Sequence, residues 1–217
     1  YTRPVYAFAL GSAVKLFFSV AITLGLSACV PTMPAPPASP LDAAHSRSVG
    51  LGYTAHSQIA KPAQDGTTSD FERGGQFWLR RKSETFEGTE SGVLVSLGMS
   101  SFAAAGGYIR TELKGLPEHV YVGTHVEGGY LWGGVGLPVA VRLSDGVWVY
   151  VQPTVRFPAY IMAHLPAGIS LNLGESMRLD AQGGLSGSGI LFGKSTPGSA
   201  MHDRVFAYGG IGLSRHW

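Results

Sequence analysis

Cysteine and charge are both scarce in this chain. Of its 217 residues only Cys29 is a cysteine, so no disulfide can form within the chain. Asp, Glu, Lys and Arg together make up 14% of the residues, and the formal net charge is +2. That charge is too small to create the positive field of a nucleic-acid-binding surface. We therefore predict no nucleic-acid partner.

Helical periodicity and metal-ligand spacing are also missing. No segment as long as a crossover helix repeats its apolar residues with a period of 3.6, which argues against βαβ units. The seven histidines are scattered without the spacing of a metal site: His45, His56, His119, His125, His164, His202 and His216. The sequence therefore predicts no metal, no cofactor and no catalytic residue.

The first 28 residues predict an export signal. Arg3 and Lys15 are their only charged residues, and residues 16–26 are apolar or small. A basic region followed by a short apolar core is typical of a secretory signal. This core is shorter than the roughly 20 residues that a membrane-spanning helix needs. The sequence Leu26-Ser27-Ala28-Cys29 closes the segment and resembles the lipobox of bacterial lipoproteins.

That resemblance implies a lipid-anchored protein. In such lipoproteins the signal is removed, and the thiol of the new N-terminal cysteine, here Cys29, carries a diacylglycerol. Acyl chains of the palmitate type then anchor the protein in the membrane. Val30 follows, and a residue other than Asp at that position is compatible with sorting to the outer membrane. The resemblance thus implies localisation at the cell outer membrane and membrane lipid as a partner through the acylated N-terminus. Without the two basic residues of the signal, the formal charge falls from +2 to zero.

A proline-rich stretch follows the cysteine. Residues 30–40 contain five prolines, which remove backbone donors and fix φ, so this stretch should be extended and outside any sheet. We interpret residues 29–46 as the lipidated cysteine with a tether. The predicted domains are therefore a signal peptide at 1–28, this tether, and a β-barrel domain at 47–217.

The remaining sequence alternates with the period of two that is typical of strands. Val147, Val149 and Val151 point one way, while Trp148 and Tyr150 point the other. Tight turns such as residues 144–146 join the alternating runs. We predict an all-β antiparallel meander of about eight to ten strands, which avoids exposed edges by closing into a barrel.

The outer face of this barrel decides its environment. In a membrane barrel the apolar rows face lipid and the polar rows fill the lumen, whereas a soluble barrel has its apolar rows inside. The end of the chain favours the membrane barrel, because Tyr208, Ile211, Leu213 and Trp217 resemble the C-terminal assembly signal of outer-membrane barrels. That resemblance implies the barrel assembly machinery as a partner. Arg215 departs from the pattern, which usually has an apolar residue there.

Polar residues on the inner faces of the expected strands predict a network in the lumen. A charge inside a narrow barrel must be paired or hydrated. An interior ladder of arginines with acidic residues meets that demand, and a selective pore is the alternative role. The candidate residues are Glu127, Arg142, Gln152, Arg156, Arg178 and Asp180.

Three functions remain open from the sequence. The first is an outer-membrane lipoprotein whose small barrel has a structural or surface-interaction role without catalysis. The second is a periplasm-facing soluble barrel, such as a lipocalin-like protein, that binds a small apolar ligand or a protein partner. The third is a lipid-modifying outer-membrane enzyme that uses a serine with His125 and Glu127, which share a strand face. The sequence identifies no ligand.

Overall fold

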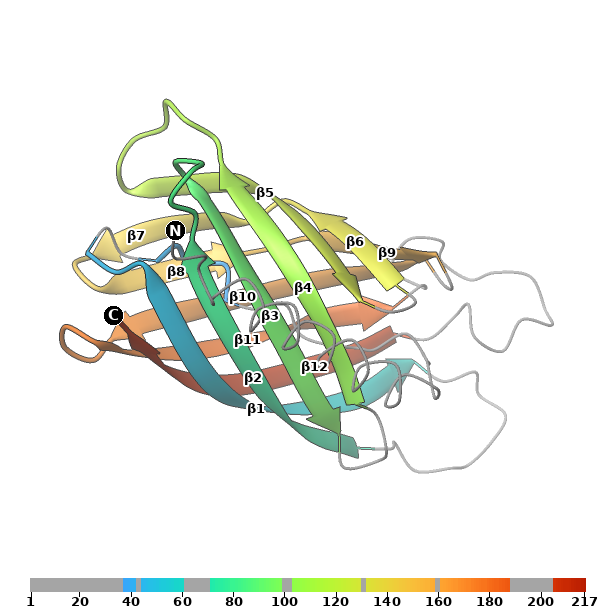
Figure 1. Cartoon of the computed structure of the whole chain (residues 1–217). Coiled ribbons are helices and arrows are strands. Elements are labelled where there is room, and N and C mark those ends of the chain that lie inside the picture. Colours follow the sequence, from blue (N-terminus) through green and yellow to red (C-terminus); the bar gives the residue numbers. More distant parts are fainter. Residues whose placement is uncertain are drawn as a thin grey trace, which may run out of the picture.

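A computed structural model of the chain describes residues 37–41, 44–60, 71–98, 103–129, 132–158, 161–187 and 205–217. The predicted signal peptide and Cys29 lie outside these residues. The described chain forms twelve strands, shown in Figure 1: β1 (Arg47–Ala60), β2 (Phe71–Lys82), β3 (Thr89–Gly98), β4 (Ala103–Glu112), β5 (Val120–Gly129), β6 (Trp132–Gly136), β7 (Val139–Ser144), β8 (Val147–Val151), β9 (Thr154–Pro158), β10 (Met162–Asn172), β11 (Met177–Gly187) and β12 (Val205–His216). No helix in these ranges is long and apolar enough to cross a membrane.

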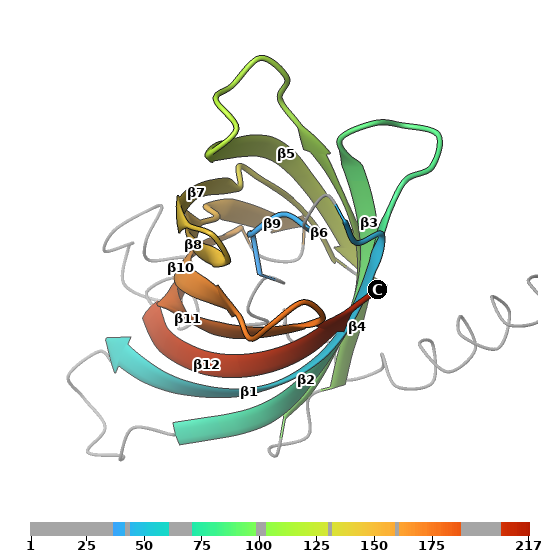
Figure 2. The ribbon, with the colours of Figure 1, turned by 90° about the vertical axis from the view of Figure 1, so that its left-hand side faces the viewer.

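The strands form one closed antiparallel barrel. Each long strand pairs with its neighbours in sequence, and β1 closes the barrel by pairing with β12, from Ser48 opposite His216 onward. β6 and β7 together occupy one position beside β5, and β8 and β9 together occupy one position beside β10. The barrel is therefore ten-stranded around its circumference, which confirms the predicted fold class. Figure 2 looks along it from one end.

Prolines interrupt the two positions in the barrel wall that are each filled by a pair of short strands. Pro138 separates β6 from β7, and Pro153 separates β8 from β9. Proline has no N–H to donate to a ladder, so the regular pairing stops there. The carbonyls remain in use, since Gly123 N donates to Pro138 O at 2.9 Å and Leu137 N donates to Pro153 O at 2.9 Å. The alternation continues across both breaks, and the wall stays continuous.

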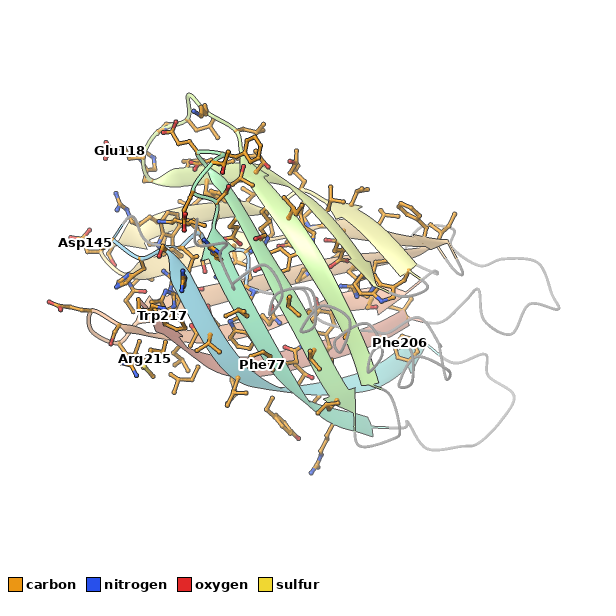
Figure 3. All side chains as sticks on the ribbon, in the orientation of Figure 1. Phe77, Glu118, Asp145, Phe206, Arg215 and Trp217 are labelled. Carbon is orange, nitrogen blue, oxygen red and sulfur yellow. The ribbon has the colours of Figure 1, made fainter. Side chains whose placement is uncertain are left out.

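The two ends of the barrel differ in their connections. At the end where β1 begins and β12 ends, here named the terminal end, the joining residues are 83–88, 113–119, 145–146 and 173–176. Glu118, Asp145, Arg215 and Trp217 all lie at this end (Figure 3). At the opposite end the sequence between strands is longer at two connections, 61–70 and 188–204, and short at the other three, 99–102, 130–131 and 159–161. Short turns on the periplasmic side and longer loops outside are typical of outer-membrane barrels.

The apolar rows face outward. Leu51 is 67% exposed and Ile211 is 62% exposed, and Phe77 also lies on the outer surface (Figure 3). The inward positions hold polar and charged side chains, among them four arginines that are at most 1% exposed. A soluble barrel requires the reverse arrangement. The orientation is therefore the one expected of a barrel surrounded by lipid.

Aromatic rings line the inner wall where neighbouring strands carry glycine. Trp78 on β2 lies over Gly50 and Gly52 of β1 and over Gly212 of β12. A Cβ atom at Gly50 or Gly212 would come within 2.2 or 2.3 Å of the indole, so only glycine fits there. The inner wall thus accommodates a large ring without moving the backbone.

The four residues of the C-terminal strand that resemble the assembly signal lie on both of its faces. Ile211, Leu213 and Trp217 face outward, as an apolar row should, whereas Tyr208 is 5% exposed and points inward. The reason is parity, because Tyr208 is an even position of a strand whose odd positions face lipid. Arg215 is also on the outer face, at the terminal end (Figure 3).

Candidate functional site

Glu90 on β3 is the centre of a cluster of charged side chains inside the barrel. It bridges two arginines, one from each of the neighbouring strands. Arg80 Nη2 on β2 lies 2.9 Å from Glu90 Oε2, and Arg110 Nη1 on β4 lies 3.1 Å from Glu90 Oε1. Glu90 and Arg110 are directly opposite in the β3–β4 register, and all three residues point inward. Each carboxylate oxygen therefore accepts from a different guanidinium, which is the pairing that buried charges require.

A second carboxylate, Glu127 on β5, pairs with Arg156 on β9. Arg156 Nε donates to Glu127 Oε1, and Arg156 Nη2 donates to Oε2 at 3.2 Å. These strands are not neighbours, because β6 lies between them and contributes Gly134 opposite both residues. A Cβ at Gly134 would lie 2.9 Å from Glu127 Oε1 and 3.1 Å from Arg156 Cγ. The missing side chain is what lets the two charges meet.

His125 joins the two groups. Its Nδ1 lies 3.3 Å from Arg110 Nε, and its Nε2 lies 3.1 Å from Glu127 Oε2. Arg110 also donates to Gln152 Oε1 at 2.7 Å. One continuous polar network therefore runs across the lumen from β2 to β9.

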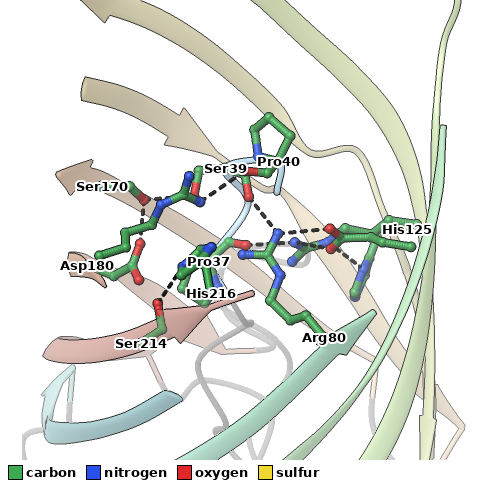
Figure 4. A network of polar contacts seen from close by, with 12 residues as sticks. Pro37, Ser39, Pro40, Arg80, His125, Ser170, Asp180, Ser214 and His216 are labelled. Carbon is green, nitrogen blue, oxygen red and sulfur yellow. Dashed lines mark hydrogen bonds and ion pairs between the residues drawn. The ribbon is translucent and has the colours of Figure 1, made fainter. Parts of the chain in front are cut away.

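The other side of the lumen holds Arg178 and Asp180 on β11. Asp180 Oδ1 accepts a short hydrogen bond from Ser170 on β10. Arg178 Nε donates to Asn172 Oδ1 at 3.0 Å. Arg178 also reaches residues 37–41, which cross the lumen near the terminal end (Figure 4).

Residues 37–41, which we name the plug segment, are held by three arginines. Arg110 Nη1 donates to Pro37 O at 2.6 Å, Arg80 Nη2 donates to Ser39 O at 2.6 Å, and Arg178 Nη1 donates to Pro40 O at 2.9 Å. The Ser39 hydroxyl lies 2.7 Å from that of Ser170. Ala38 is completely buried in an apolar cluster with Tyr121, Ala140, Trp148 and Tyr150. The sequence indicated a tether here and did not predict a position inside the barrel.

Five of the six candidate network residues are buried in the lumen: Glu127, Gln152, Arg156, Arg178 and Asp180. Arg142 is on the inward side of β7, opposite Trp148, but it is exposed. Its guanidinium carbon lies 5.9 Å from the Trp148 ring centroid. Arg142 is thus near the terminal end and makes no described contact with the other five, because its strand position is too close to the end of the barrel.

The sequence reasoning missed Arg80, Glu90, Arg110 and His164. His164 Nε2 lies 3.4 Å from Arg156 Nη1 and so extends the network to β10. Parity could have identified Glu90, since Val93, Val95 and Leu97 define the outer face of its strand and Glu90 is out of phase with them.

The described contacts of His125 do not form the serine–histidine site of the third sequence hypothesis, a lipid-modifying enzyme. Both ring nitrogens of His125 face charged residues, Arg110 and Glu127, rather than a serine. A separate Ser–His contact on β12 joins Ser214 Oγ to His216 Nε2 at 3.0 Å. No group of three or more His, Cys, Asp or Glu residues among the described ones could hold a metal ion.

No protein-family model matches the sequence, and no curated protein sequence matches it. Solved structures do resemble the fold. The attachment invasion locus protein Ail of Yersinia pestis is 13% identical with a TM-score of 0.38, and the match covers 80% of this chain and 99% of that one. The KdgM porin in complex with disordered oligogalacturonate is 7% identical with a TM-score of 0.47, covering 78% and 99%. The translocator domain of the autotransporter NalP from Neisseria meningitidis is 11% identical with a TM-score of 0.43, covering 97% and 98%. Similarity at this level carries no argument about function.

Proposed function

We propose that this protein is an integral outer-membrane barrel with an additional lipid anchor at Cys29, and that its role is structural or surface-interaction rather than catalytic. The observation that carries the proposal is the inside-out distribution of side chains. Leu51, Val126 and Ile211 are each more than half exposed on the outer wall, while Arg110, Arg156 and Arg178 are buried inside. In water that arrangement leaves apolar surface exposed, whereas in a bilayer the same surface contacts acyl chains.

Strand length supports the same environment. A tilted strand needs about 9–11 residues to cross a bilayer. β3, β4 and β5 have 10 residues each, β10 and β11 have 11, and β2 and β12 have 12. The split positions reach a similar length by adding β6 to β7 and β8 to β9.

The lumen supports a non-catalytic role. Glu90 and Glu127 are each held by arginine from both of their oxygens, and His125 lies between the two groups. Pairing with arginine is what a buried carboxylate requires, so these contacts are explained without a catalytic role. The network is the kind that fills a small barrel with its own side chains.

Fractionation with heat-modifiable gel mobility tests the barrel. The full chain, expressed in a Gram-negative host, is compared with a Cys29→Ala chain after alkaline extraction of outer membranes. We expect both to resist extraction and to migrate faster before boiling than after it. Recovery of the Cys29→Ala protein as a folded monomer in the soluble periplasm contradicts the proposal.

Labelling with radioactive palmitate tests the anchor separately. We expect label in the wild-type chain and none in Cys29→Ala. A wild-type chain without label contradicts lipidation and leaves the barrel proposal standing. Depletion of the barrel assembly machinery provides the test of that partner, since the heat-modifiable form should then disappear from the outer membrane.

A further inference from the structure

Three arginines lie together on the outer wall of the barrel at its terminal end. Arg47 on β1 is directly opposite Arg81 on β2 in the strand register. Arg215 on β12 is opposite Val49, the next outward residue of β1 after Arg47. All three arginines are exposed and occupy odd positions of strands whose odd positions face outward. Figure 3 shows Arg215 and Trp217 at this end. The three arginines, here named the arginine patch, thus span three adjacent strands.

The arginine patch is confined to one side of the barrel. At the terminal end, the last outward residues of β3 and β4 are threonines, Thr89 and Thr111. On β5, β7, β8, β10 and β11 the corresponding residue is valine, leucine or methionine. Among the described strands, charge on the outer wall at this end is therefore limited to β12, β1 and β2. An even attraction to a membrane surface would not need charge concentrated in this way.

The arginine patch has little negative charge within it. Arg47 and Arg81 are like charges in a directly opposed cross-strand pair, which is a destabilising arrangement. Arg81 pairs with Glu84 of the adjoining turn in an exposed contact. None of the ion pairs among the described residues includes Arg47 or Arg215. An anion bound between these strands would relieve the repulsion, because each guanidinium can donate charge-assisted hydrogen bonds to it.

The wall next to the arginine patch is apolar. Leu79 on β2 and Leu213 on β12 are the next outward residues toward the middle of the barrel, and they are 42% and 44% exposed. Trp217 is also exposed on the outer face at the end of the chain. Tryptophan is enriched where the hydrocarbon of a membrane meets the headgroups. An anion held at the patch would therefore have apolar surface on one side and water on the other, which is the environment of a phospholipid phosphate.

We propose that the arginine patch binds the headgroup of an anionic phospholipid in the membrane leaflet at the terminal end. This inference rests on the proposed membrane barrel. The guanidinium forks of Arg47 and Arg215 suit the oxygens of a phosphate group. A headgroup with a net negative charge is favoured over a zwitterionic one, because the ammonium group of the latter would meet the same arginines. The proposal also gives a role to Arg215, which departs from the apolar pattern of its strand.

Quenching of tryptophan fluorescence by brominated lipids tests this site in the full chain, refolded into vesicles. Trp217 is the reporter, because its backbone exchanges hydrogen bonds with Arg47 at 3.0 and 3.1 Å. A Trp217→Phe chain supplies the background from the other tryptophans. Vesicles of phosphatidylcholine contain the same minor fraction of either brominated phosphatidylglycerol or brominated phosphatidylcholine. We expect the anionic lipid to quench Trp217 several-fold more than the zwitterionic lipid does.

Substitutions locate the preference on the barrel wall. A chain with both Arg47→Gln and Arg215→Gln should lose it, because Arg81 then remains with Glu84 as its partner. Arg73→Gln is the matched control, since Arg73 is exposed on the outer wall of β2 toward the opposite end. We expect this variant to keep the preference. If Arg73→Gln loses it as well, the effect belongs to the overall charge of the barrel, which contradicts the proposed site.

Heat-modifiable mobility is measured for every chain so that the outcomes remain separate. A wild-type chain without it contradicts the proposed barrel itself. A folded wild-type barrel that both lipids quench equally, or a double variant that keeps the preference, contradicts the lipid site alone. A salt series on wild type needs no substitution. The preference should fall as the Debye length shortens from about 10 Å at 0.1 M to about 3 Å at 1 M. A preference that does not change with salt overturns the inference.

Discussion

Replacing Glu90 by Gln should be among the most destabilising single changes in the barrel wall. The carboxylate accepts from Arg80 at 2.9 Å and from Arg110 at 3.1 Å, and the side chains of both arginines are 1% exposed. Hydrogen bonds to a charged group contribute about 1.5–3 kcal/mol each. Removal of one partner of a buried ion pair costs about 3–5 kcal/mol, because the remaining charge is left uncompensated.

Contacts with the plug segment place the expected loss of stability near the lower end of that range. Ser39 O and Pro37 O still accept from the same two guanidinium groups in the Glu90→Gln chain. The amide also keeps one acceptor oxygen, although its NH₂ group then faces a donor. We therefore expect a loss of about 3 kcal/mol in the free energy of unfolding.

Equilibrium urea unfolding of the barrel refolded into lipid vesicles, followed by tryptophan fluorescence, measures this loss. The midpoint should fall with an unchanged m value, because the surface exposed on unfolding is the same. Glu87→Gln is the matched control, since Glu87 pairs with Lys114 at 2.7 Å in an exposed contact between turns. We expect that variant to unfold like wild type. Equal midpoints for Glu90→Gln and Glu87→Gln refute the reasoning.

Three further outcomes follow from the same structure. Gly212→Ala places a Cβ 2.3 Å from a buried indole and should destabilise the barrel by about 1–3 kcal/mol in urea unfolding, whereas Gly75→Ala, with open space around it, should not. Ile211→Lys on the outer wall should cost about 2–4 kcal/mol in vesicles if the residue faces the bilayer centre, and a barrel that keeps its stability contradicts the lipid-facing assignment. Lys114 lowers the pKa of Glu87 through a hydrogen bond and its charge, so that stabilisation is present above the ordinary carboxyl pKa and is lost as pH falls through the lowered one. Lys114→Met should raise the pKa of Glu87, and carboxyl NMR titration measures the change.

The positions of the strands and the directions of their side chains were predictable, because both follow from the alternation of side chains with a period of two. The alternation through Val147, Val149 and Val151 predicted that Trp148 and Tyr150 point the other way, and both are buried inside. A side-chain period of two allows few alternatives once a run contains several apolar residues. The same rule places Tyr208 inside, because Ile211 and Leu213 of its strand are odd-numbered and face outward.

The position of a residue along the barrel axis and its contacts across the lumen were not predictable in this way. Parity assigns Arg142 to the inner side but does not say that it lies too near the end to join the network. Pairing between Glu127 and Arg156 depends on Gly134, a residue of the intervening strand. The contacts of the plug segment are the extreme case, since Ser39 and Arg178 are separated by 139 residues. No local pattern encodes such a contact, because proline-rich sequence predicts an extended backbone and not its location.

The position of the plug segment inside the barrel bears on what a lipid at Cys29 would do. A barrel that inserts by itself needs no acyl chain for attachment, so the two anchors are redundant if holding the membrane is their only task. Cys29 precedes Pro37 by eight residues, a stretch that spans at most about 26–29 Å when fully extended. A bilayer's hydrocarbon core is about 30 Å thick. A lipid on Cys29 would therefore fix the upstream end of the segment within one membrane thickness of its binding site. On this argument the lipid would hold the stretch between Cys29 and the plug segment close to the membrane, which attachment through the barrel alone does not require.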